Sequence, residues 1–204
     1  MKGVIKMNKF KMLLVVLFIG LLGVVVVPKE STAEELISQN VSRTPEEQQE
    51  LLNAIPEGYK LVESSELTRG IHGNLYGKVH LQSYGWSNSL NVEQYYLGST
   101  GRGLRIEALA LAFSSNKASI KYRLHVQSHG WLGWSSNGAV NGTTGKGLRA
   151  EAVQISASGL YRVMYRTHIQ GKGWTGWSQN GQTSGTTGKA LRMEAIDIVL
   201  ITLL

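Results

Sequence analysis

Two tryptophans with nearby amide side chains are the residues best suited to binding a sugar. Asn137 follows Trp134, and Asn180 and Gln182 follow Trp177. An indole ring can cover the apolar face of a sugar while neighbouring amides bind its hydroxyl groups. We therefore treat these five residues as candidate ligand-binding residues. The alternative is that both indoles are ordinary half-buried side chains.

A basic residue, a histidine and a glutamine at alternate positions form a second candidate set. The set occurs three times, as Lys78, His80 and Gln82, as Arg123, His125 and Gln127, and as Arg166, His168 and Gln170. Alternate residues of a strand share one face. A cation beside two hydrogen-bonding groups suits an acidic sugar or a phosphate. The alternative is that these groups bridge strands. Nothing in the sequence indicates that the histidines converge on a metal, and we expect no metal or cofactor.

Two other recurring sets are expected to be structural. Because replacing Trp by Ser in a core would leave a large cavity, the position that holds Trp134, Trp177 and, in the first copy, Ser89 is unsuited to a core. The tryptophans present in every copy are instead assigned to core or inter-repeat packing: Trp86, Trp131 and Trp174. Arginine and glutamate two residues apart invite ion pairing, and these pairs are Arg105 with Glu107, Arg149 with Glu151, and Arg192 with Glu194.

The sequence offers no catalytic constellation. It contains no cysteine, which excludes thiol nucleophiles, disulfides and thiolate metal sites. Asp197 is the only aspartate after residue 70, and no acidic residue stands at a spacing that suggests a partner for the histidines. The glycine-rich turns at 142–145 and 185–188 lack the GK[ST] ending of a phosphate loop. We therefore expect no enzymatic activity.

All of these residues belong to a stretch that the chain carries three times, at about residues 75–113, 120–157 and 161–204. His80, His125 and His168 recur at a period of about 44 residues, which is typical of a repeat architecture. The shared pattern H-[LVI]-Q-x3-GW, then G-[ST]-TG, then LRxEA resembles the ChW repeat family (clostridial hydrophobic, with a characteristic Trp) over about residues 75–202. The resemblance implies secreted or surface-attached proteins of Gram-positive bacteria with adhesion or polymer-binding roles.

Each copy is predicted to form four strands, two long and two short. Tyr122, Leu124 and Val126 alternate with polar residues, which indicates a half-buried strand. Asn-Gly at 137–138 and 180–181 predicts a hairpin turn, and the LRxEA motif begins a second long strand. Twelve strands in three equal units predict an all-β, closed, pseudo-threefold array of the β-prism or β-trefoil type, because closure removes exposed edges.

The first 70 residues differ from the repeats. Four lysines precede an apolar run at 12–27, which predicts a signal peptide at 1–33. The run is shorter than the roughly 20 residues that span a bilayer, and an uncleaved anchor is the alternative. Residues 34–70 form an acidic preamble, in which Thr44 and Pro45 predict the start of a helix that ends near Ala54. Residues 71–204 form the repeat domain.

These observations together predict a secreted or cell-surface, non-catalytic module. We expect it to bind carbohydrate or an anionic cell-wall polymer multivalently, because three weak sites on one body gain avidity on a repeating polymer. The alternative is a protein–protein interaction or adhesion module. The expected partners are a cell-wall or extracellular glycan, or a surface protein. Nucleic acid is not expected despite the net charge of +7, and contact with a membrane is expected only through an uncleaved leader.

Overall fold

A computed structural model describes residues 38–40, 43–62 and 73–204, and all of these belong to one compact unit. The predicted signal peptide at 1–33 lies outside the described residues, as do parts of the preamble. Within the described residues, no helix has the length and apolar character needed to cross a membrane. The prediction of an all-β repeat region is confirmed, and the preamble contributes one short helix.

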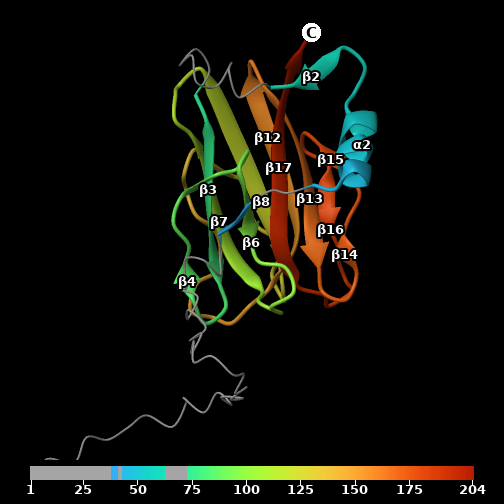
Figure 1. Cartoon of the computed structure of the whole chain (residues 1–204). Helices are drawn as coiled ribbons and strands as arrows, with labels where there is room; N and C mark the ends of the chain where they lie inside the picture. The colour runs from blue at the N-terminus through green and yellow to red at the C-terminus, as the bar shows by residue number, and fades with distance from the viewer. Residues whose placement is uncertain (1–37, 41–42, 63–72) are drawn as a thin grey trace, which may run out of the picture. The chain divides into compact units, whose positions relative to one another are not determined.

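Each repeat consists of two long strands with three short strands between them (Figure 1). The first repeat comprises β3 (Leu75–Leu81), β4 (Gly85–Trp86), β5 (Leu90–Asn91), β6 (Tyr95–Gly98) and β7 (Ile106–Phe113). The second comprises β8 (Ala118–Val126), β9 (Gly130–Trp131), β10 (Ser135–Ser136), β11 (Asn141–Gly142) and β12 (Ala150–Gly159). The third comprises β13 (Arg162–Ile169), β14 (Gly173–Trp174), β15 (Ser178–Gln179), β16 (Thr183–Gly185) and β17 (Met193–Leu203). The prediction of four strands per repeat was therefore wrong by one short strand.

A β-bulge accounts for the additional strand. Both β9 and β10 pair with β8, with Trp131 opposite His125 and Ser135 opposite Tyr122. Four steps along one strand thus match three along the other, which is the signature of one extra residue. The first and third repeats show the same offset. The interruption at 132–134 divides the expected short strand in two, and Trp134 lies within it.

The two long strands of each repeat pair with each other in an antiparallel manner, and each pair then receives a short strand from another repeat. β11 of the second repeat pairs with β7 of the first, β16 of the third with β12 of the second, and β6 of the first with β17 of the third. Every repeat therefore both donates a strand and receives one.

The Asn-Gly signal marks a turn, but the strands around it do not form the predicted hairpin. The Ala139 N–H donates to the Ser136 carbonyl at 3.0 Å, and Asn137 and Gly138 both have positive φ, as a tight turn requires. β10, before the turn, pairs with β8, whereas β11, after it, pairs with β7. The turn passes the chain from one sheet to another, because β11 is the strand donated to the first repeat.

The first glycine of the G-[ST]-TG motif lies where the donated strand meets its neighbour. Gly142 has a φ of +118°, and a Cβ there would collide with the backbone of Glu107 and Ala108 in the first repeat. Its successor Thr143 donates its N–H to the Glu107 carbonyl at 2.9 Å. Gly98 and Gly185 occupy the same positive-φ position in the other two repeats. The motif is therefore a joint between repeats.

The core is formed by the inward faces of the long strands from all three repeats. Tyr122, Leu124 and Val126 are fully buried, whereas Arg123 and His125 of the same strand are partly exposed, so the predicted half-buried strand is confirmed. Equivalent inward residues of the other sheets, including Val79 and Ile196, join the same cluster. The basic residue and the histidine of each repeat therefore lie on the outer side of a sheet.

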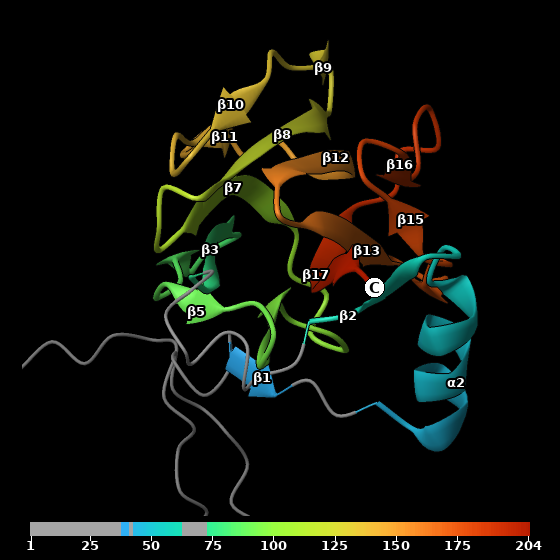
Figure 2. The same ribbon diagram turned by 90° about the horizontal axis from the view of Figure 1, so that it is seen from above.

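The preamble packs on the outer side of the third repeat. β1 (Ser38–Asn40) pairs with β6, and β2 (Tyr59–Leu61) pairs with β17. The helix α2 (Pro45–Ala54) begins with a capping box between Thr44 and Glu47, as its N-terminal sequence predicted. Leu51 of α2 is buried against Met164 and Val199 of the third sheet. Figure 2 shows the helix on the side of the molecule that holds β13 and β15.

Candidate functional site

The same cluster of side chains occurs on the outer side of each repeat. In the second repeat, the Arg123 guanidinium lies 5.0 Å from the centre of the Trp131 ring, and the His125 ring meets that indole edge-on at 5.4 Å. The His125 Nδ1 lies 3.1 Å from Glu151, which also pairs with Arg149 at 2.7 Å. The other repeats hold the same cluster in these residues: Lys78, Trp86, His80, Glu107 and Arg105; Arg166, Trp174, His168, Glu194 and Arg192.

The histidines therefore have acidic partners, contrary to the expectation from sequence. Each histidine stands on the first long strand of its repeat and meets the glutamate of the LRxEA motif on the second, at 3.0 to 3.1 Å. The partners are 26 or 27 residues apart in sequence, so only the pairing of the two strands brings them together. Each His–Glu contact therefore links the two long strands of its repeat, whereas the arginine that also binds the glutamate stands two residues before it in the chain.

The three invariant tryptophans are half-buried on the outer surface and lie outside the hydrophobic clusters. They were expected in the core or between repeats. Among the described residues, Trp174 is the only one of the three in ring contact with an aromatic residue of another repeat, at 5.0 Å from Tyr96. Their place follows from strand pairing. Each Trp stands directly opposite the repeated histidine of the long strand, and residues opposite each other share one face of the sheet, here the outer one.

The amide groups of the candidate set are largely occupied by the backbone. Asn137 Oδ1 accepts from the Ile120 N–H at 3.2 Å, and Asn180 Oδ1 accepts from the Ala157 N–H at 2.8 Å. Gln182 Oε1 accepts from the Gln179 N–H at 2.8 Å. These bonds fix the turns that follow the second tryptophan. Gln82, Gln127 and Gln170 are half-buried just beyond their strands. Their backbone N–H groups donate to the arginine carbonyls of the LRxEA motifs.

The two tryptophans proposed for ligand stacking have different surroundings. Trp177 is half-buried and packs against the small hydrophobic cluster that Leu51, Met164, Val199 and Ile201 form under α2. Trp134, at the equivalent position of the second repeat, is 43% exposed. In the first repeat the position holds Ser89. The structure thus presents one exposed indole at this position.

The cations beside Trp177 are matched by acids. Arg166 and Arg43 lie 4.9 and 5.5 Å from the centre of its ring. Both bind Asp197, with Arg43 at 2.6 Å and Arg166 at 3.0 Å, and Arg166 also lies 3.3 Å from Glu47 of α2. Burial raises the pKa of Asp197, and the two guanidinium groups oppose that shift.

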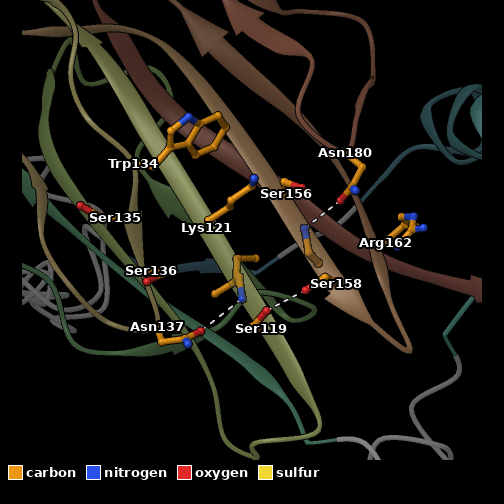
Figure 3. A pocket seen from close by; sticks show the side chains of 12 residues that line it. Ser119, Lys121, Trp134, Ser135, Ser136, Asn137, Ser156, Ser158, Arg162 and Asn180 are labelled. Atoms are coloured by element: carbon orange, nitrogen blue, oxygen red, sulfur yellow. Dashed lines mark hydrogen bonds between the residues drawn. The ribbon is translucent and has the colours of Figure 1, made fainter.

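A groove of about 580 Å³ opens beside Trp134 on the outer side of the second repeat. Figure 3 shows Trp134 at one end, Ser119 and Ser158 toward the other, and Arg162 of the third repeat along one side. The groove is rich in hydroxyl groups, and its five serines are Ser119, Ser135, Ser136, Ser156 and Ser158. The Ser119 and Ser158 hydroxyls lie 2.7 Å apart across β8 and β12. Asn137 and Asn180 complete its polar lining.

Two basic side chains, Lys121 and Arg162, line this groove, and a third, Arg123, lies beside its tryptophan. The Lys121 ammonium lies 5.1 Å from the centre of the Trp134 ring, and the Arg123 guanidinium lies 4.8 Å from it. Arg123 donates from Nε to the neutral Gln154 amide at 2.8 Å. Arg162 stands on the first strand of the third repeat and is exposed. No acidic side chain within the part of the chain that the structure describes forms a salt bridge with any of the three.

Sequence reasoning missed Lys121, Arg162 and the serines of the groove. A usable signal existed in the differences between copies. Ser156 on the outer side of β12 corresponds to Val199 on β17, and Lys121 corresponds to Met164. Polar residues in one copy and apolar residues in another, at the same outward positions, distinguish an exposed surface from a covered one.

No cluster of three or more histidines or acidic residues suitable for a metal ion occurs among the described residues. Each repeated histidine faces the glutamate of its own sheet. The histidines therefore do not meet at a common centre.

Three segments of the chain match the family model described as Clostridial hydrophobic W, at residues 80–114, 125–159 and 168–201. Each match begins at the repeated histidine and contains the Trp and LRxEA motifs. No curated protein and no solved structure matches the chain.

Proposed function

The chain belongs to the Clostridial hydrophobic W family, and on that premise we propose that it is a non-catalytic binding module for carbohydrate or an anionic cell-wall polymer. The proposed site is the groove beside Trp134 in the second repeat. The carrying observation is an exposed indole at the end of a serine-lined groove. An aromatic ring next to hydroxyl and amide groups suits a sugar, which has apolar C–H faces and polar edges.

The geometry supports one such site per molecule in place of three equivalent ones. The third repeat has its counterpart tryptophan under α2, and the first has Ser89 there. Ala112 and Leu90 of the first repeat stand where the second repeat has Ser156 and Ser135, so part of the serine lining is also missing. Avidity on a polymer would then require several molecules and not several repeats of one molecule.

The cyclic donation of strands supports a closed, prism-like array as the scaffold of this site. Each repeat contributes one short strand to the sheet of another repeat. The first contributes β6 to the third, the second contributes β11 to the first, and the third contributes β16 to the second. In such an array every long strand has a partner at both edges, which removes exposed edges from the sheets. The closed arrangement would hold Arg162 of the third repeat beside the second sheet.

Secretion or attachment to the cell surface completes the proposal. The basic residues and the apolar run before Pro28 favour export, and the absence of cysteine leaves stability to the packed core. A glycan or polymer outside the cell would be the partner under this proposal, and a surface protein is the alternative partner.

A binding screen against glycans and cell-wall polymers tests this function. Wild-type protein should bind at least one polysaccharide, and Trp134→Ala should reduce that binding at least tenfold. Trp134→Phe should restore part of it, because a ring remains available for stacking. Tyr84→Ala is the matched control, since Tyr84 is 42% exposed and lies outside the groove. Failure of the folded wild type to bind any polysaccharide at low or high salt would overturn the proposal and favour a protein partner.

A further inference from the structure

We infer that the ligand of the groove carries a negative charge, which it places between Lys121 and Arg123 beside Trp134. This inference rests on the proposed function and specifies its ligand class as an anionic polysaccharide or polyol polymer, with either carboxylate or phosphate groups. In the third repeat, the equivalent arginine meets acids supplied by the chain itself.

In the third repeat, carboxylates pair with the cations that lie against the two tryptophans. Arg166 lies between Trp174 and Trp177, 4.9 Å from each ring centre. It binds Asp197 of the adjoining strand and Glu47 of α2. The second cation on Trp177, Arg43, binds the same aspartate. Three carboxylates, those of Asp197, Glu47 and, at 4.0 Å, Glu50, therefore surround the two guanidinium groups at this position.

The second repeat has the same stack without the acids. Arg123 lies between Trp131 and Trp134, at 5.0 and 4.8 Å, which reproduces the geometry of Arg166. Lys121 takes the place of Arg43 on the second indole. The strand position that holds Asp197 in the third repeat holds Gln154 here, since Arg166 is opposite Asp197 and Arg123 is opposite Gln154. Among the described residues the two cations therefore lack the counter-charge that their equivalents have.

The surroundings indicate that a polar ligand, and not a helix, supplies the missing charge. α2 covers the third repeat because Met164, Val199 and Ile201 make its outer side apolar. At the corresponding positions of the second repeat stand Lys121, Ser156 and Ser158, which give a helix no apolar surface to bury. Hydroxyl groups beside two cations and an indole match a sugar or polyol that bears an acidic group.

Substitution of Gln154 tests the inference through charge alone. Gln154→Asp should place in the second repeat the carboxylate that the third already has, so that Arg123 is neutralised from within. Gln154→Asn is the matched control, because asparagine has the shape of aspartate without its charge. Ser156→Asp with Ser156→Asn forms a second pair, directed at Lys121, in case the first aspartate variant does not fold. Melting curves establish that each variant is folded.

Binding is measured for polygalacturonate, for its fully methyl-esterified neutral form and for a glycerol-phosphate polymer. We expect at least one of the two anionic polymers to bind the wild type and the Asn variants, and the Asp variants to bind it at least tenfold more weakly. Which of the two binds distinguishes carboxylate from phosphate.

The remaining outcomes contradict the inference in separable ways. Equal binding of neutral and anionic pectin that still depends on Trp134 would overturn the requirement for charge and leave the proposed carbohydrate function intact. Anionic binding that is indifferent to Trp134 and to the Asp variants would place the ligand elsewhere and overturn both. No binding of any of the three polymers at low salt would overturn the inference, whereas the proposed function falls only if the wider screen also finds no polysaccharide that binds.

Discussion

At the scale of single residues, Trp134 and Trp177 show how different surroundings give two equivalent tryptophans different roles. Both follow the same GW strand and both lie beside an arginine at 4.8 to 4.9 Å. Trp177 packs against the cluster under α2, whereas Trp134 is 43% exposed beside the groove. The Trp177 indole therefore contributes to stability, and the Trp134 indole is available to a ligand.

Replacing each indole by alanine should separate these roles. Trp177→Ala removes a partly buried ring from a packed cluster and should lower the free energy of unfolding by about 2 to 4 kcal/mol. Trp134→Ala loses mainly its contacts with two cations and should cost about 1 kcal/mol or less. Denaturant unfolding of both variants measures the difference. Equal destabilisation would show that Trp134 is as much a packing residue as Trp177.

The sequence showed which residue types occupy this position, but not which of the two indoles is covered by another part of the chain. The exchange of Trp for Ser89 predicted a position outside the core, whereas Trp177 packs against a hydrophobic cluster because α2, more than 100 residues earlier in the chain, covers it. The hydrogen-bond partners of the asparagines could not be predicted either, because Asn180 accepts from the Ala157 N–H of another repeat. Such contacts depend on how the strands are exchanged.

At the scale of strands, the joints between repeats account for the most regular features of the sequence. The bulge between β9 and β10 sets Trp134 in an interruption of its strand, and the glycine of the G-[ST]-TG motif lets a donated strand approach its neighbour. The alternation of residues revealed the long strands correctly. It did not reveal their exchanged partners, since the strands on the two sides of an Asn-Gly turn ordinarily pair with each other.

Gly142→Ala should be strongly destabilising. A methyl group would collide with the backbone of Glu107 and Ala108, and the φ of +118° is unfavourable for any residue with a Cβ. We expect a loss of about 3 kcal/mol or more, measured by thermal or denaturant unfolding. Gly176→Ala serves as the control, because a Cβ there meets no atom within 4 Å. A Gly142 variant as stable as this control would refute the close joint.

Another joint makes stability depend on pH. Glu93 accepts the Leu200 N–H of β17 at 3.0 Å, in the role that Asn180 has toward Ala157 in the second sheet. Burial raises the pKa of Glu93 to about 7, although the Leu200 hydrogen bond and Arg43 oppose the shift. Because the folded pKa exceeds the unfolded value, the folded protein holds this proton more tightly. The contribution to stability is complete below about pH 4.5 and is lost as the pH rises through 7.

Glu93→Gln should remove this dependence, since glutamine keeps a neutral acceptor oxygen. Relative to the variant, the wild type should lose up to about 3 kcal/mol of unfolding free energy between pH 5 and pH 8. Denaturant unfolding of the two proteins at both pH values gives the difference. Parallel pH profiles for wild type and variant would contradict a proton held by Glu93 in this range.

At the scale of the whole molecule, the preamble is an integral layer of the fold and not a tether. Its strands pair with β6 and β17, and its helix covers the apolar outer side of the third repeat. The acidic residues of the preamble include Glu47, which forms an ion pair with Arg166 of the third repeat. The three repeats thereby become unequal: the third is covered, the first lacks the second indole, and the second keeps an open groove.

Adjacent leucines of α2 test this layer. Leu51 is 1% exposed and Leu52 is 45% exposed. Leu51→Ala should cost about 2 to 4 kcal/mol of stability, because it leaves a cavity between the helix and the third sheet. Leu52→Ala should change stability by about 0.5 kcal/mol or less. Both variants should keep their binding to polysaccharide, since no residue of α2 lines the groove. Equal effects of the two substitutions on unfolding would show that the helix is not docked as described.

The central claim is that the protein has one ligand site, beside Trp134 of the second repeat, and the five tryptophans allow a direct test. In a two-dimensional proton–nitrogen NMR spectrum, each indole N–H gives its own signal, which single Trp→Phe variants assign. Titration with the polysaccharide that binds in the screen should shift the Trp134 signal most, followed by Trp131, which shares Arg123 with it. The signals of Trp86, Trp174 and Trp177 should stay in place. Comparable shifts of Trp86, Trp131 and Trp174 would instead show three equivalent sites and contradict the account.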